Sequence, residues 1–213
     1  MPGTVITIAQ QKGGAGKTTL AAQLASLWLS QGHAVATVDI DPQQSLTGWV
    51  AARRAALPES AGPEHRQVSG WRTQREVDQL ARGHDIVLID SPPHADTEAK
   101  IAVRSAALVL APLQLSPMDV WATQSTFDLA RAEKKPLMVV LNRVPARAKM
   151  ADTLLAQLTE LGAELAETRL GNRVAFAASM LEGKGVAETA RSDKAALEVA
   201  ALGREILNRA LAG

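Results

Sequence analysis

The sequence predicts an α/β fold, a doubly wound and mostly parallel sheet with helices on both faces. Short continuous runs of Val, Ile and Leu recur along the chain, and such runs are typical of strands buried on both faces. Segments with helical spacing alternate with these runs, as the crossover connections of a parallel sheet require. A glycine-rich loop also stands between the first apolar run and the first helical segment. We therefore expect functional groups at the carboxyl ends of the strands, where such sheets bind ligands.

The expected elements follow in order along the chain. Residues 5–9 are mostly β-branched and apolar and predict a strand, and residues 18–30 predict a helix because Leu20, Leu24 and Leu27 share one face. Further strands are expected at residues 34–41, 85–90, 106–113 and 136–142. Further helices are expected at residues 45–57, 73–82, 119–134, 151–161 and 193–212. Residues 58–65 (PESAGPEH) carry Pro and Gly and are expected to form a surface connection.

Length and composition limit the class of protein. At 213 residues the chain suits one sizeable domain, so we expect residues 1–213 to form a single domain. We expect no signal peptide and no membrane-spanning helix, because the start lacks a basic, cleavable leader and no apolar run is long enough. Cysteine is absent, which excludes disulfides and thiolate metal sites. The net charge of +1 does not by itself indicate nucleic acid.

The loop at residues 10–19, QQKGGAGKTT, predicts a phosphate-binding site. In loops of the pattern G-x-x-x-x-G-K-[ST], backbone N–H groups surround phosphate, the lysine contacts its oxygens and the hydroxyl binds Mg²⁺. Gln11 stands where that pattern has its first glycine, and Lys12 is an additional lysine. The residues expected to hold the nucleotide are Lys12, Gly13, Gly14, Ala15, Gly16, Lys17, Thr18 and Thr19.

Polar side chains also follow the other expected strands. Asp39 and Asp41 end the second strand, Asp90 ends the third and Asn142 follows the last. A carboxylate at the end of an apolar strand is costly unless a cation or a donor meets it. These positions are candidates for Mg²⁺ and water in a phosphoryl-transfer site, and Asn142 could contact a base or simply end its strand in a turn.

Several motifs resemble those of one family. They are KGGAGKTT at residues 12–19, VDIDPQQSLTGW at 38–49, DIVLIDSPP at 85–93, PLQLSPMD at 112–119 and VVLNRV at 139–144. The first is similar to the deviant Walker A loop of the ParA/MinD ATPases, and the chain resembles most the short, ParF-like partition proteins without an N-terminal helix-turn-helix domain. The resemblance spans residues 5 to about 144.

The resemblance implies a mechanism and assigns roles. It implies that ATP and Mg²⁺ are bound, that ATP is hydrolysed slowly to ADP, and that Lys12 reaches across an ATP-dependent sandwich homodimer to the partner's phosphate. Lys17 and Asp41 would complete the catalytic set, with Asp41 orienting the attacking water. Thr18, Asp39 and Asp90 would surround the metal, and Asn142 would contact adenine.

Missing residue types exclude some relatives, and others stay open. Nitrogenase-type iron proteins, iron–sulfur carriers and the zinc-clasped targeting ATPase need cysteine, and the bacterial kinases of this fold carry a tyrosine cluster; this chain has neither residue. An amide-forming synthetase of the cobyrinic-acid or dethiobiotin type remains the enzyme alternative, although it does not require Lys12. A non-catalytic nucleotide switch and a MinD-like membrane role are further alternatives. Residues 193–212 lack the aromatic bulk of an interfacial helix and are expected to pack in the core.

The resemblance also implies partners and a location. ParA proteins bind nucleoid DNA without sequence preference and act with an ATPase-stimulating adaptor such as ParB, which would place this chain in the cytoplasm on the nucleoid. The candidate DNA contacts are Arg143, Arg147, Lys149, Arg173, Lys184 and Arg191. Scattered basic surface residues are also ordinary, and the cargo could be a plasmid, a chromosome, a compartment or a chemoreceptor cluster.

Overall fold

The computed structural model describes residues 2–93, 97–145 and 151–212. The strands are β1 (Thr4–Ile8), β2 (Val35–Asp39), β3 (Glu64–Gln67), β4 (Ile86–Asp90), β5 (Leu108–Leu113), β6 (Leu137–Leu141) and β7 (Glu164–Leu165). The helices are α1 (Lys17–Ser30), α2 (Ser45–Ala56), α3 (Arg72–Ala81), α4 (Thr97–Ser105), α5 (Pro117–Ala132), α6 (Ala151–Glu160), α7 (Val174–Leu181), α8 (Val186–Thr189) and α9 (Lys194–Leu211), with a short 3₁₀ turn at Glu59–Ala61.

The strands form one seven-stranded sheet in the order β3-β2-β4-β1-β5-β6-β7. Every pair of neighbouring strands is parallel. β1 lies in the middle, and its last residue, Ile8, pairs with Asp90 at the end of β4, while Asp39 at the end of β2 also pairs with Asp90. The register therefore brings the glycine loop after β1 and the carboxylates after β2 and β4 to one edge of the sheet.

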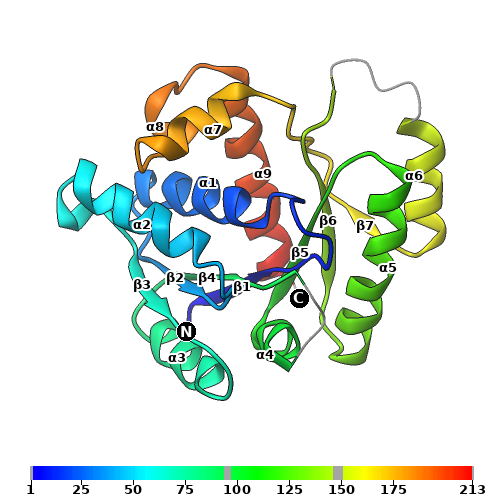
Figure 1. Cartoon of the computed structure of the whole chain (residues 1–213), viewed down its shortest axis with the longest axis horizontal. Helices are drawn as coiled ribbons and strands as arrows, with labels where there is room; N and C mark the ends of the chain where they lie inside the picture. The colour runs from blue at the N-terminus through cyan, green and yellow to red at the C-terminus, as the bar shows by residue number, and fades with distance from the viewer. Residues whose placement is uncertain (1, 94–96, 146–150, 213) are drawn as a thin grey trace.

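Helices cover both faces of the sheet, as Figure 1 shows. Alternate strand residues divide between the two faces, because successive side chains of a strand point in opposite directions. Ile6 and Ile8 pack in the cluster formed with α1, α2, α7, α8 and α9. Val5 packs with α3 and α4 on the opposite face, where a further cluster joins β5 and β6 to α5 and α6. The predicted doubly wound α/β fold is confirmed.

The structure contains elements that the pattern of residues did not predict. β3 (EHRQ) lies within and beyond the expected surface connection, and α4, β7, α7 and α8 were also not predicted. β3 is an edge strand that, within the described part of the chain, pairs with β2 alone, so it does not need an apolar run. Its polar sequence is consequently indistinguishable from a loop until β2 is in place.

α9 packs in the core as expected. Its buried residues Val199, Leu202 and Ile206 lie in the same cluster as α1, and Gly203 lies so close to Leu27 that an added Cβ would be 2.4 Å from Leu27 Cδ2. In the part of the chain that the structure describes, no helix combines the length and the apolar character needed to cross a membrane.

Candidate nucleotide-binding site

The glycine loop owes its shape to its glycines. Gly14 and Gly16 have positive φ angles of 76° and 96°, a region that favours glycine. A Cβ on Gly16 would also lie 2.4 Å from the side-chain nitrogen of Asn142. α1 begins at Lys17, directly after the loop, so its free N–H groups and positive end face the place where phosphate would lie.

The two lysines of the loop have different surroundings. Lys17 is buried, and its Nζ donates to the Gln10 carbonyl oxygen at 3.1 Å. Burial lowers the pKa of Lys17, and the nearby carboxylates of Asp90 and Asp41 oppose that effect. The Lys12 side chain is 37% exposed and extends to Asp119. Only Lys17 is therefore enclosed by the loop of its own chain.

The Lys12 ammonium forms an ion pair that the sequence did not indicate. Its Nζ lies 2.6 Å from Oδ2 of Asp119, whose side chain is only 3% exposed. Asp119 is in the first turn of α5, where Ser116 is the N-cap and also hydrogen-bonds the Asp119 carboxylate. In the single chain, Lys12 is thus held by its own Asp119.

Thr18 and Asp90 together fit a metal ion. The Thr18 hydroxyl donates to Asp90 Oδ2 at 2.7 Å, whereas the buried Asp90 Oδ1 has no hydrogen-bond partner among the residues that the structure describes. Burial raises the pKa of Asp90 to about 7. An unpartnered carboxylate oxygen beside a hydroxyl suits Mg²⁺, which prefers oxygen ligands and usually takes few of them from protein. Among the described residues no group of three or more His, Asp or Glu could hold a metal, so nucleotide oxygens and water would complete the shell.

Asp39 was also expected to surround the metal, but its carboxylate is engaged by the protein itself. Both of its carboxylate oxygens are used by the protein: Oδ1 accepts from the Asp41 N–H at 3.1 Å, and Oδ2 accepts from the Thr47 N–H and hydroxyl, each at 2.8 Å. Asp39 is fully buried, while Asp41 is half-buried and lines the cavity of the glycine loop. Asp39 therefore holds the backbone around Asp41, and metal ligation by Asp39 remains a prediction.

Two neighbouring cavities lie at this edge of the sheet. The first, the phosphate cavity, has a volume of about 440 Å³ and is lined by the glycine loop, Thr18, Asp41 and Met180 among others. The second, the base cavity, has a volume of about 350 Å³ and apolar walls that include Leu20, Leu170 and Phe176. Thr19 and Arg143 line both. A polar cavity joined to an apolar one suits a nucleotide, with its phosphates in the first and its base in the second.

Asn142 lines the base cavity, but its amide is already engaged. Its Nδ2 donates to the Ala15 carbonyl oxygen at 2.9 Å, and its Oδ1 accepts from the Arg143 N–H at 2.9 Å. These bonds support the glycine loop from β6. The remaining hydrogen and lone pair of the amide stay available to a base, so the predicted adenine contact is neither shown nor contradicted.

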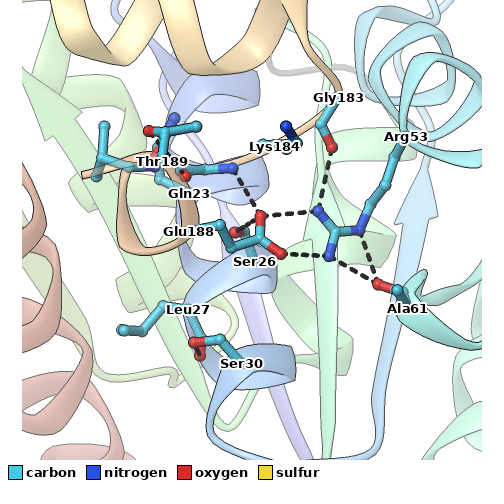
Figure 2. A network of polar contacts seen from close by, with 12 residues as sticks. Gln23, Ser26, Leu27, Ser30, Arg53, Ala61, Gly183, Lys184, Glu188 and Thr189 are labelled. Atoms are coloured by element: carbon cyan, nitrogen blue, oxygen red, sulfur yellow. Dashed lines mark hydrogen bonds and ion pairs between the residues drawn. The ribbon is translucent and has the colours of Figure 1, made fainter. Parts of the chain in front are cut away.

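A network of polar contacts centred on Arg53 is drawn in Figure 2. Arg53 of α2 is 2% exposed and pairs with both carboxylate oxygens of Glu188 on α8, at 2.7 and 2.9 Å. The same guanidinium donates to the carbonyl oxygens of Ala61 and Gly183, and Glu188 also accepts from Ser26 of α1. The network therefore joins α1, α2 and the turn between α7 and α8.

The structure separates the candidate DNA contacts. Arg143 lines both cavities, and Arg173 lines the base cavity and forms an ion pair with Glu198. Lys184 pairs with Glu182, and Arg191 is exposed and has no partner among the described residues. Arg147 and Lys149 lie outside the described residues. Binding of DNA by any of these residues stays a prediction.

Two functional contacts were missed by the sequence. Asp119 could have been recognised only as the acidic residue three positions after the N-cap Ser116 in SPMD, because its contact with Lys12 joins segments 107 residues apart. His65 stands in no recognisable motif, yet its ring lies 2.9 Å from the Thr37 hydroxyl and 3.0 Å from the Thr47 hydroxyl. Burial lowers the pKa of His65, although the Asp39 carboxylate opposes this effect.

Comparison with known proteins agrees with this site. A family model described as the CobQ/CobB/MinD/ParA nucleotide binding domain matches residues 6–186. The chain is 27% identical over 217 residues to the maintenance of carboxysome distribution protein A of Halothiobacillus neapolitanus, covering 97% of this chain and 95% of the relative. It is 29% identical over 186 residues to protein ParA of Rhizobium radiobacter, covering 82% and 81%.

A solved structure has the same fold. The ATP complex of a Cyanothece McdA variant matches with a TM-score of 0.78 at 17% identity and covers 96% of both chains. At that identity the match concerns the fold alone. The resemblance noted in the motifs is confirmed by the family model, which spans most of the chain: the protein belongs to the CobQ/CobB/MinD/ParA family of nucleotide-binding proteins.

Proposed function

We propose that the chain is a ParA-type ATPase that binds ATP with Mg²⁺, dimerises around the nucleotide and hydrolyses it slowly to ADP. The observation that carries this proposal is the contrast between the two loop lysines. Lys17 is buried against its own loop, while Lys12 is partly exposed and directed to Asp119. A loop with one enclosed and one outward lysine suits phosphate bound by its own chain and phosphate presented by a second chain.

The residues of this chain divide the chemistry of hydrolysis. Lys17, Thr18 and the loop amides would hold the β- and γ-phosphates, and Asp41 at the edge of the phosphate cavity would orient a water molecule toward the γ-phosphorus. A bond forms from the water oxygen to the γ-phosphorus, and the bond from that phosphorus to the β-phosphate oxygen breaks. The water loses one proton to a phosphate oxygen or to solvent, and ADP and inorganic phosphate leave. Bound Mg²⁺ would supply charge neutralisation, and Thr18 and Asp90 are the residues placed to hold it.

Dimerisation would require an exchange of partners at Lys12. The ammonium would leave the Asp119 carboxylate and meet the phosphate of the facing subunit. Charge-assisted bonds to phosphate are among the stronger polar contacts, and a twofold dimer contains the contact twice. The exchange therefore links the presence of ATP to the association of two chains.

The relatives suggest what the nucleotide cycle serves. Those compared above are named for carboxysome distribution and for ParA. We propose that the dimer binds nonspecific DNA on the nucleoid, responds to a ParB-like or other adaptor, and segregates or positions a plasmid, chromosome or compartment. Arg191, which is exposed and unpaired among the described residues, is the first candidate for a phosphate contact.

The test compares wild type, Lys12→Gln and a matched control, Lys100→Gln, which removes the charge of an exposed lysine on α4 that pairs with Glu133. Analytical ultracentrifugation is run with ADP and with a non-hydrolysable ATP analogue, and retention of duplex DNA is measured at low salt. Wild type and control should dimerise and bind DNA only with the analogue. Lys12→Gln should bind one nucleotide per chain yet dimerise at least about a hundredfold more weakly, since each lost charged contact contributes about 1.5–3 kcal/mol and there are two.

Two results would contradict the proposal. Wild type that stays monomeric with the analogue, or Lys12→Gln that dimerises as well as wild type, would reduce Lys12 to a structural loop residue. ATP-dependent formation of an amide, with no dimer and no DNA retention, would instead favour the synthetase alternative.

A further inference from the structure

A chain of hydrogen bonds connects the edge of the sheet to the turn that carries Asp41. Asp41 belongs to the turn of residues 40–44, and the amide of Asp41 donates to Asp39 Oδ1. The other Asp39 oxygen accepts from both the amide and the hydroxyl of Thr47, in the first turn of α2. Gln44, the N-cap of α2, has no side-chain cap bond of its own and has a φ of 55°. The buried Asp39 carboxylate therefore holds both the turn and the start of α2.

From Thr37 to Asp39, the hydrogen bonds of this series all run in one direction, from donor to acceptor. A carboxylate oxygen accepts, so the single hydroxyl proton of Thr47 is committed to Asp39. Toward His65 Nε2, 3.0 Å away, the Thr47 oxygen must then accept, which places the ring proton on Nε2. Nδ1 of the neutral ring is left to accept from the Thr37 hydroxyl at 2.9 Å. The result is an unbroken series from Thr37 through His65, Thr47 and Asp39 to the Asp41 amide.

The position of His65 in the fold makes this series stiff. His65 lies on the edge strand β3 directly opposite Thr37 of β2, which is fully buried. Its ring spans from β2 to α2 and fixes the rotamer of the Thr47 hydroxyl. No residue of the glycine loop takes part in this series, because Lys17 and Thr18 bond to Gln10 and Asp90 instead.

We infer that His65 is a positioning residue for Asp41, acting through Thr47 and Asp39. This inference rests on the proposed function, because Asp41 orients water only if the chain hydrolyses ATP. His65 touches neither cavity, so its effect should fall on the chemical step and spare nucleotide binding. Small displacements of a catalytic group are sufficient to slow a reaction severely.

The test uses His65→Phe, which keeps a ring without its hydrogen bonds, and His65→Gln, which keeps an amide donor for Thr47. Thr47→Val removes the next link. His84→Phe is the matched control, since the His84 ring bonds to the Leu80 carbonyl oxygen and lies 3.3 Å from Glu64 Oε2 on β3, but contacts no member of this series among the described residues. Two quantities are measured: the hydrogen-exchange rates of the Asp41 and Thr47 amides without nucleotide, and KM against kcat for ATP. Thermal unfolding of each variant establishes that it is folded.

We expect His65→Phe and Thr47→Val each to speed exchange at both amides and to lower kcat about tenfold with KM unchanged. The double variant should lose no more than either single one, because both act through one route. His65→Gln should recover part of the loss, and His84→Phe should behave as wild type.

The outcomes separate this inference from the proposed function. If His65→Phe, or Thr47→Val where the Phe variant does not fold, keeps wild-type exchange at the Asp41 amide, His65 does not position the turn and the inference fails. An increase in KM with kcat unchanged would also overturn it. If wild type does not turn over ATP but both amides still lose protection in the variants, the ATPase proposal fails and the coupling to Asp41 stands.

Discussion

The buried Asp90 carboxyl should make the stability of the nucleotide-free protein fall as pH rises. Its pKa is raised from 3.8 to about 7 by burial, so the folded chain holds this proton more tightly than the unfolded chain. The Asp90 carboxyl therefore stabilises the folded state fully only below its pKa in the unfolded chain. That stabilisation is lost as the pH rises through its pKa in the folded chain. The difference between the two pKa values corresponds to at most about 4 kcal/mol in the free energy of unfolding, because each pKa unit is worth about 1.4 kcal/mol.

The perturbation is Asp90→Asn, which replaces the titrating group by a neutral one of the same shape. Urea unfolding is measured without Mg²⁺ for wild type and variant from about pH 5 to about pH 8, over which wild type should lose about 3 kcal/mol relative to the variant. Adding Mg²⁺ with ATP analogue at the upper end should stabilise wild type more than the variant, since both retain the phosphate-binding loop but only wild type has the ionised carboxylate for the metal. Parallel pH profiles for the two proteins would refute the reasoning, and so would equal rescue of both by Mg²⁺.

Two further predictions concern the phosphate cavity. Asp119→Asn removes the intramolecular partner of Lys12 and should tighten the ATP-analogue dimer by about five- to thirtyfold. The reason is that a partly exposed ion pair contributes about 0.5–1 kcal/mol, and a dimer no longer has to break two of them. A weaker dimer in ultracentrifugation would show that Asp119 orients Lys12 instead of restraining it. Asp41→Ala should lower kcat at least about a hundredfold with ATP affinity nearly intact, whereas Lys17→Ala should lose ATP binding itself. Turnover of Asp41→Ala at the wild-type rate would exclude the water-orienting role.

The sequence predicted the parts of the fold that carry a local signal. Apolar runs such as residues 85–90 identify buried strands, and the glycine loop identifies the strand before it and the helix after it. α7 gave no such signal, because its sequence VAFAASML is apolar throughout and has no periodic polar face. Its position depends on contacts with α1 made by Gln23, whose side chain bonds to Phe176, Ser179 and Val186.

The site was predicted in part for the same reason. Residues that follow strands could be placed at one edge of the sheet from the order of elements alone. The partners of these residues could not be predicted, because they come from distant segments of the chain. Asp119 contacts Lys12, and His65 is linked to the Asp41 turn, only once those segments pack together. Asp39 shows the limit most clearly: its place was predicted, but its two oxygens are occupied by Asp41 and Thr47, a fact that depends on the path of the chain after β2.

Arg53 gives the site a mechanical property. α2 starts beside the Asp41 turn, and its last part is bound through the Arg53 guanidinium to Gly183 and Glu188. A Cβ added to Gly183 would lie 2.3 Å from the backbone nitrogen of Arg53. The chain has no room for a side chain at Gly183, so α2 packs closely against the turn that follows α7, and α7 itself carries Met180 of the phosphate cavity and Phe176 of the base cavity. A movement of α2 at the Asp41 turn, such as one that follows loss of the terminal phosphate, would thus be transmitted to α7. Because α7 lines both cavities, such a movement would also alter the walls around the base.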